Sequence, residues 1–85
     1  MIQIYSTTWC PDCKAAKMAL DQLGLPYHET DIDRDPQGEQ KVLEANQGRR
    51  SVPTLVYNGQ AVSMSRFSIA RLRTWLAEVG LLAST

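Results

Sequence analysis

The stretch "STTWCPDCKAAKMAL" (residues 6–20) decides the fold and carries the chemistry of this chain. It contains both cysteines, Cys10 and Cys13, separated by a proline and an aspartate. Proline is favoured at the first position of a helix, so a helix is expected to begin at Pro11 with Cys10 as its cap. Residues 2–6, just upstream, predict a strand. The paired cysteines therefore lie where a strand passes into a helix.

Helical spacing of apolar residues predicts three helices, each ending at a glycine that can adopt the left-handed conformation at little cost. They begin at Pro11, near Asp35-Pro36 and after a Ser68 cap, and end at Gly24, Gly48 and Gly80. The residues expected to face inward are Cys13, Ala16, Leu20 and Leu23, then Val42 and Leu43, then Ile69, Leu72, Leu76 and Val79. The second helix is the weakest prediction, because Gly38 falls in its first turn.

Short strands are predicted at residues 2–6, 27–32, 54–57 and 61–63. The last two flank Asn58-Gly59, which is typical of a two-residue type I′ hairpin turn. The element order is then β-α-β-α-β-β-α, with the first two strands parallel and joined by a right-handed crossover. The expected fold class is α/β, with one four-stranded mixed sheet flanked by three helices in a single domain of residues 1–85.

The composition is that of an ordinary globular protein, with 85 residues, 44% of them hydrophobic and 21% charged, and a formal net charge of zero. This balance gives no indication of binding to nucleic acid or an anionic membrane. No apolar run is long enough to span a bilayer, and the first residues lack the features of a signal peptide. We therefore expect a monomer in the cytoplasm, a compartment where thiols are kept reduced and paired cysteines are more often catalytic or metal-binding than structural.

The start of a helix favours a thiolate at Cys10, because unpaired N–H groups and the helix dipole stabilise negative charge there. The thiolate is the nucleophile in disulfide exchange. Cys13, one turn further along the apolar stripe, is expected to be less exposed and to attack a mixed disulfide formed at Cys10. Asp12 opposes the thiolate by roughly 0.6 kcal/mol in water, or about 2.4 at a dielectric of 20, for charges about 7 Å apart. We expect Asp12 to weaken the effect without cancelling it, with Lys14 and Lys17 offsetting part of the repulsion.

Two other roles for the cysteine pair remain open: a structural staple and a metal site. A disulfide across so short a loop stabilises a protein by about 2 kcal/mol, at the low end for disulfides. A structural zinc site needs four ligands, whereas the chain offers two cysteines and His28. No metal ligands are therefore predicted. A CxxC at the strand-to-helix junction of a β-α-β unit favours redox chemistry.

Four motifs follow one another along the chain: Thr8-Trp9-Cys10-Pro11-Asp12-Cys13, Pro26-Tyr27 running into Asp31-Ile32-Asp33, Ser51-Val52-Pro53-Thr54, and Asn58-Gly59. In this order and spacing they resemble the glutaredoxin family of the thioredoxin fold. The similarity is greatest to bacterial redoxins, including mycoredoxins and those that serve ribonucleotide reductase. The resemblance implies the sheet order second, first, third and fourth strand. It also implies a cis Pro53 that faces the cysteines and a Val52 backbone that pairs with the bound thiol substrate.

The implied activity is dithiol–disulfide exchange, in which Cys10 attacks a protein disulfide or a protein–small-thiol mixed disulfide and Cys13 resolves the intermediate. No bound cofactor is implied. Electrons come from a low-molecular-weight thiol (mycothiol, bacillithiol or glutathione) or from thioredoxin reductase. Glutathione-using members commonly have tyrosine in place of Asp12 and a Gly-Gly and acidic segment in place of residues 62–67. This chain has neither feature, so the other donors are equal alternatives.

The remaining candidates surround the cysteines. The expected supporting residues are Trp9, Pro11, Asp12, Val52 and Pro53, and the expected substrate-binding residues are Thr8, Arg50 and Arg66. An arginine can dock a substrate carboxylate by charge-assisted hydrogen bonds, although Arg50 is equally expected to be a solvated loop residue. Trp9 is expected to form an apolar rim for partner proteins or to be partly buried on the sheet. An iron–sulfur carrier, with a cluster between two chains, and a non-catalytic interaction domain are the alternative functions.

Overall fold

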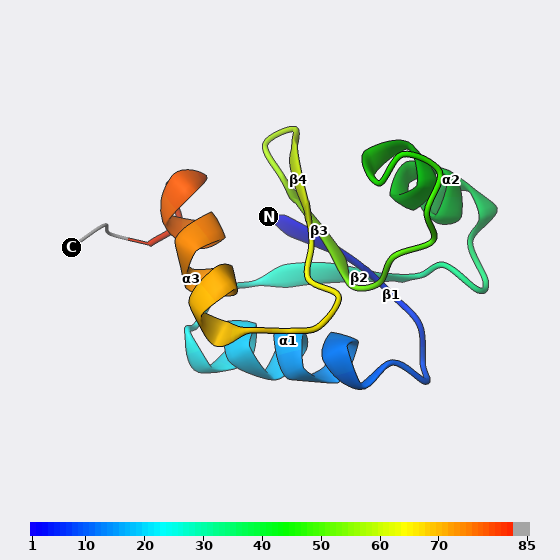
Figure 1. Ribbon diagram of the computed structural model, residues 1–85. Coiled ribbons are helices and arrows are strands. Elements are labelled where there is room, and N and C mark those ends of the chain that lie inside the picture. The colour runs from blue at the N-terminus through cyan, green and yellow to red at the C-terminus, as the bar shows by residue number, and fades with distance from the viewer. Residues whose placement is uncertain (83–85) are drawn as a thin grey trace.

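The computed structural model describes residues 1–82 and contains three helices and one four-stranded sheet (Figure 1). The elements in chain order are β1 (Ile2–Ser6), α1 (Pro11–Gln22), β2 (Tyr27–Asp31), α2 (Pro36–Ala45), β3 (Thr54–Tyr57), β4 (Gln60–Ser63) and α3 (Ile69–Glu78). The predicted element order and fold class are confirmed, with boundaries that differ by one residue at β2 and β4. Within the described residues, no helix is long and apolar enough to cross a membrane.

The sheet has the order β2-β1-β3-β4, as the resemblance implied. β1 pairs in parallel with β2 and antiparallel with β3, and β3 and β4 form the predicted hairpin. Asn58 and Gly59 have φ angles of 52° and 80°, which is the left-handed conformation that a type I′ turn requires at both positions. Because β1 is a central strand and leads directly to the cysteine stretch, the site lies at the carboxyl end of β1, in the middle of the sheet.

Two hydrophobic clusters hold the helices on opposite faces of the sheet (Figure 1). The larger cluster joins α1 and α3 to one face, and its fully buried members include Ile4, Leu20, Leu55, Leu72 and Leu76. The smaller cluster joins α2 to the other face through Tyr5, Ile32 and Val42. In this three-layer arrangement, the start of α1 lies at the end of the sheet where β1 ends.

The prediction that Ile69 faces the core is wrong, because its side chain is 49% exposed. The buried face of α3 is centred on Leu72, Trp75 and Leu76. At about 100° per residue, Ile69 lies roughly 70° from the centre of that face. Leu43, also expected to face inward, is only half-buried, whereas its neighbour Val42 is fully enclosed.

Gly38, the residue that weakened the prediction of α2, is where this helix approaches the sheet most closely. A Cβ atom at this position would lie 2.8 Å from Cγ2 of Thr30 on β2 and 3.5 Å from the ring of Tyr5. The Asp35 cap secures the same turn, since its Oδ1 accepts the N–H groups of Gln37 at 3.0 Å and Gly38 at 3.1 Å. The glycine is therefore explained by close packing.

We expect Gly38→Ala to destabilise the protein by about 1 kcal/mol, although alanine favours helices. The close contact with Thr30 adds an overpacking cost of roughly 1–3 kcal/mol, which exceeds the gain of about 0.5–1 kcal/mol in helix propensity. Urea unfolding measures the difference. Gln40→Ala, on an exposed position of α2, serves as a control, and adding Thr30→Ser should recover part of the loss. A Gly38→Ala protein more stable than the parent would contradict this account of the packing.

Candidate active site

Cys10 caps α1, as the sequence predicted. Its backbone is extended, and its Sγ accepts the backbone N–H of Cys13 at 3.1 Å, while Pro11 occupies the first helical turn. Both cysteines are free thiols. Cys10 is 4% exposed and Cys13 is fully buried, in the expected order. An N-cap sulfur that already accepts a backbone N–H has a donor in place for the negative charge of a thiolate.

The loop before β3 lies beside the first cysteine. The Val52–Pro53 peptide bond is cis, as the resemblance implied. The Val52 carbonyl oxygen accepts from the Cys10 thiol over 3.9 Å, and Pro53 is buried. The structure thus brings together Cys10, Cys13 and the Val52–Pro53 loop at the same end of the antiparallel β1–β3 pair, where β1 ends and β3 begins. The pairing of the Val52 backbone with a thiol substrate stays a prediction.

Three hydrogen bonds hold the cis-proline loop in place. The Thr54 hydroxyl donates to the carbonyl of Ser51 at 2.7 Å and accepts from the side-chain amide of Asn46 at 3.0 Å. The backbone N–H of Met64 donates to the carbonyl of Pro53 at 2.8 Å. The loop is therefore held by both α2 and the segment after β4, and it presents a fixed surface to Cys10.

Asp12 makes a contact that the sequence did not indicate. Its Oδ2 accepts the backbone N–H of Arg66 at 2.9 Å, and its Oδ1 accepts that of Phe67 at 3.2 Å. In the fold, its carboxylate joins the first turn of α1 to the 63–67 loop, the segment of residues 63–67 that leads from β4 toward α3.

Arg71 holds the same loop from the side of α3. Its Nη2 donates to the carbonyl of Ser63 at 2.9 Å, and its Nη1 donates to the carbonyls of Ser65 and Arg66, both at 3.2 Å. Three carbonyl groups of the 63–67 loop thus bind the guanidinium of Arg71, and two N–H groups of the same loop bind the Asp12 carboxylate. This arrangement fixes the loop beside the start of α1.

A second carboxylate, Asp33, connects the loops on the other side of the site. Its Oδ2 accepts from the indole N–H of Trp9 at 3.2 Å, and its Oδ1 accepts from the guanidinium of Arg50. Arg50 also donates through Nε to Glu39 at 2.7 Å. The Arg50 guanidinium, with Trp9 as a weaker donor, holds the pKa of Asp33 below its usual value. Glu39 first, and then Asp33, raise the pKa of Arg50.

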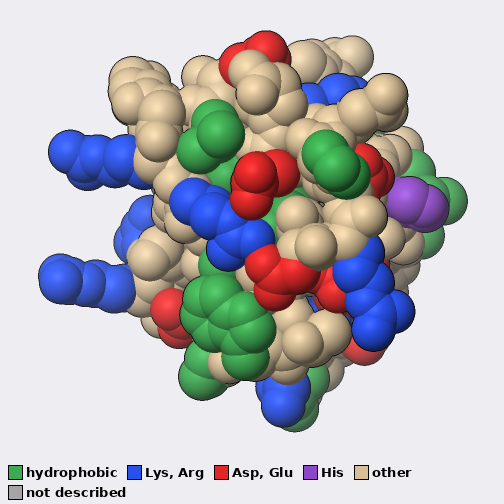
Figure 2. Space-filling model, turned by 90° about the vertical axis from the view of Figure 1, so that its right-hand side faces the viewer, with side chains coloured by type: hydrophobic (Ala, Val, Ile, Leu, Met, Phe, Trp, Pro, Cys, Tyr) green, Lys and Arg blue, Asp and Glu red, His purple; other side chains and the backbone are tan. Residues whose placement is uncertain are grey.

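These contacts change the expectations for the arginines and for Trp9. Arg50 is an exposed loop residue whose guanidinium is paired with two intramolecular carboxylates, and its role in docking a substrate stays a prediction. Arg66 and Thr8 are both exposed, and Arg66 has a φ of 59°. Trp9 is 64% exposed, which leaves most of its ring on the surface, and its role as a rim for partner proteins stays a prediction. The face bearing the start of α1 mixes acidic, basic and hydrophobic side chains (Figure 2).

Cys13 is strongly protected against ionisation. Burial, and then the hydrogen bond and charge of Cys10, raise the pKa of the Cys13 thiol to about 12. The Thr7 backbone and the charge of Lys17 act in the opposite direction. The ammonium group of Lys17 is also paired with Glu29 at 2.8 Å, a partner that the sequence did not indicate.

This raised pKa predicts a loss of stability in alkaline solution. The unfolded chain releases the Cys13 proton near the ordinary pKa of 9.0, whereas the folded protein keeps it until about 12. The contribution is fully present below pH 9 and is lost as the pH rises toward 12. Urea midpoints measured under reducing conditions between pH 8 and pH 11 should fall more steeply for the parent than for Cys13→Ala. Equal slopes would contradict a buried, protonated Cys13.

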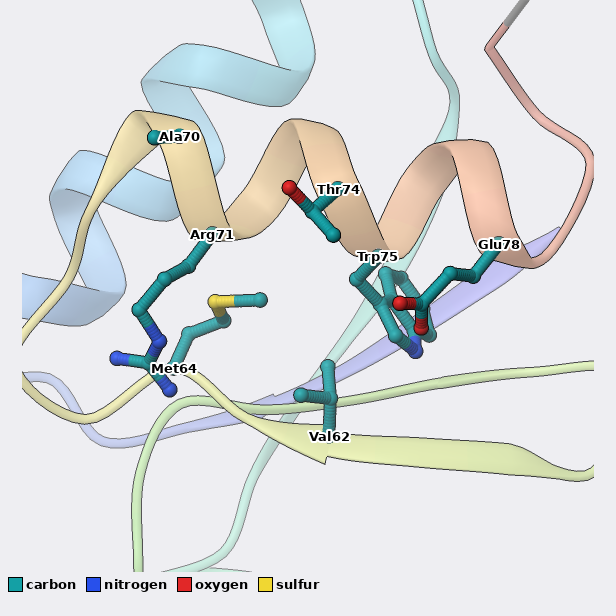
Figure 3. A pocket seen from close by; sticks show the side chains of 7 residues that line it. All are labelled: Val62, Met64, Ala70, Arg71, Thr74, Trp75 and Glu78. Atoms are coloured by element: carbon teal, nitrogen blue, oxygen red, sulfur yellow. The ribbon is translucent and has the colours of Figure 1, made fainter. Parts of the chain in front are cut away.

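The hollow between α3 and β4 is separate from the cysteines. It has a volume of about 340 Å³ and is lined by Val62, Met64, Ala70, Arg71, Thr74, Trp75 and Glu78. Figure 3 shows side chains of α3 reaching across it toward β4. Its lining includes neither cysteine, and it adjoins the site through Arg71, whose guanidinium anchors the 63–67 loop, and through Met64, whose backbone N–H is bonded to Pro53.

Comparison with known proteins agrees with this geometry. The glutaredoxin family model matches residues 2–62. Mycoredoxin 1 of Corynebacterium glutamicum is 39% identical over 57 residues, covering 67% of this chain and 70% of that protein. The structure of the thioredoxin-like protein BC3987 is 28% identical with a TM-score of 0.74, covering 87% of this chain and 97% of its own. The structure of the glutaredoxin-like NrdH-redoxin of Escherichia coli is 27% identical with a TM-score of 0.69, covering 86% of this chain and 91% of its own. The chain therefore belongs to the glutaredoxin family and is a thiol–disulfide oxidoreductase.

Proposed function

We propose that Cys10 is the attacking thiol and Cys13 the resolving thiol of a dithiol mechanism. The observation that carries this assignment is the Cys10 Sγ at the N-cap, where it accepts the Cys13 N–H at 3.1 Å. The Cys10 thiolate attacks one sulfur of a substrate disulfide, and the other sulfur leaves as a thiolate. Cys13 then attacks the Cys10 sulfur and releases the second substrate thiol. Two electrons pass to the substrate, and a Cys10–Cys13 disulfide remains.

The second step requires Cys13 to lose its proton. The charge of Cys10 is among the causes that raise the pKa of Cys13, and this charge disappears once the Cys10 sulfur is bonded to the substrate. Cys13 therefore becomes more acidic when a mixed disulfide has formed. The substrate thiolate released in the first step accepts the proton, so that the two steps balance without an added base.

The substrates proposed are protein disulfides and mixed disulfides between proteins and small thiols. The exposed Trp9 offers them an apolar contact next to Cys10, and the Asp33 carboxylate fixes its indole. The oxidised protein is then reduced by a low-molecular-weight thiol or by thioredoxin reductase. We expect glutathione and bacillithiol, which carry carboxylates, to be poorer donors than mycothiol, which carries none, because the Asp12 carboxylate lies next to the cysteines and repels theirs.

The test is an NADPH-coupled reduction of the oxidised protein with four electron donors in parallel. Thioredoxin reductase is compared with glutathione, mycothiol and bacillithiol, each with its own NADPH-dependent reductase. We expect NADPH consumption with at least one donor, and slower rates with glutathione and bacillithiol than with mycothiol. Cys10→Ser serves as the blank for each assay. Absence of NADPH consumption with all four donors would overturn the proposal.

A further inference from the structure

We propose that Asp12 is a specificity-determining residue that fills a carboxylate-binding seat beside Cys10 with the protein's own side chain. The seat is the pair of backbone N–H groups of Arg66 and Phe67, and the inference rests on the proposed attack by Cys10. In the resting protein the Asp12 carboxylate occupies both donors, at 2.9 Å and 3.2 Å. A substrate carboxylate meets a filled seat and a like charge.

The local backbone explains why these two N–H groups bind an anion. Arg66 has a φ of 59°, in the left-handed region, and is followed by a residue whose N–H points to the same carboxylate. Successive N–H groups around such a residue form a concave site for anions. Asp12 is two residues from Cys10, so a disulfide that reaches the Cys10 sulfur lies close to this seat.

The seat does not depend on Asp12 for its shape. Arg71 binds three carbonyls of the 63–67 loop, and the Met64 N–H is bonded to Pro53. Removal of the Asp12 carboxylate therefore leaves the loop anchored and two N–H donors free. The exposed Arg66 side chain adds a positive charge to the same segment. A carboxylate-bearing thiol would then find an attractive site in place of a repulsive one.

The first test compares two small disulfides that differ in charge: neutral bis(2-hydroxyethyl) disulfide and dianionic 3,3′-dithiodipropionate. The measured quantity is the ratio of their second-order rate constants with the reduced protein. We expect Asp12→Ala to raise the relative rate of the dianion about tenfold, since each freed N–H makes a charge-assisted hydrogen bond. Asp12→Asn, which removes the charge but keeps one acceptor, should give a smaller rise. Glu78→Gln, with the same charge change on an exposed position of α3, should leave the ratio unchanged.

A second measurement reports the seat directly. In ¹⁵N-resolved NMR spectra, sodium acetate should shift the amide resonances of Arg66 and Phe67 in Asp12→Ala and not in the parent, with sodium chloride at equal ionic strength as reference. An unchanged rate ratio in Asp12→Ala, or acetate shifts that avoid these two amides, would overturn the inference. A parent protein that exchanges with neither disulfide would overturn the proposed function instead, and the acetate titration would still decide whether the seat exists.

Discussion

Replacement of Cys10 by serine is expected to lower disulfide reductase activity by about three orders of magnitude or more, which is typical for the loss of a nucleophile. Serine has no sulfur with which to form a mixed disulfide, and among residues 1–82 no basic side chain is hydrogen-bonded to the Cys10 side chain that it replaces. The remaining thiol of Cys13 is fully buried, and burial, the largest cause of its raised pKa, persists in the variant, so it is poorly placed to take over the attack at neutral pH. The rate of reduction of bis(2-hydroxyethyl) disulfide measures the effect.

This variant is also expected to fold as well as the parent. Serine is among the preferred N-cap residues, and its Oγ can accept the Cys13 N–H that the Cys10 sulfur accepts now. The thermal unfolding midpoint of the reduced Cys10→Ser protein should therefore equal or exceed that of the reduced parent. If Cys10→Ser kept substantial activity while folded, Cys10 would not be the attacking group.

Replacement of Cys13 by serine is expected to convert a transient intermediate into a stable product. Cys10 in this variant still attacks a disulfide, but no second thiol lies close enough to release the substrate. A stoichiometric adduct should accumulate, with one substrate half bonded to Cys10. Intact-mass spectrometry measures this adduct, which should disappear on treatment with dithiothreitol.

The Cys13→Ser variant also separates two routes of turnover. Reduction of protein disulfides should be lost, because the dithiol route needs both cysteines. Turnover of small-thiol mixed disulfides should persist where a free small thiol attacks the adduct at Cys10. The parent under the same conditions should show only a low adduct occupancy. A Cys13→Ser protein that released protein substrates as fast as the parent would exclude Cys13 as the resolving thiol.

The sequence predicted the fold well because its main signals are local. Proline at position 11, the Asn58-Gly59 turn and the spacing of apolar residues each act over a few residues, and they determine element type and order. The position of Cys10 at a strand-to-helix junction followed from the same signals. The cis bond at Pro53 came from the resemblance to a family and not from the local residues.

The missed contacts all join segments that are distant in sequence. The bonds from Asp12 to the loop N–H groups cross 54 and 55 positions, and the bond from Trp9 to Asp33 crosses 24. The periodicity of the sequence does not indicate such pairs, and each residue taken alone is equally compatible with a solvated charge or an exposed ring. The ion pairs of Arg50 were missed for the same reason, because its partners Asp33 and Glu39 are identified only once α2 is placed.

The double anchoring of the 63–67 loop has a consequence for how the chain can change in length. The loop is bound to α1 through Asp12 and to α3 through Arg71, so its span is set by two helices that are themselves packed on the sheet. An inserted residue here would break one anchor or the other, whereas the exposed turn at Asn58-Gly59 has no such double attachment. Insertions and fused tags are therefore expected to be tolerated at the hairpin and excluded from the 63–67 loop.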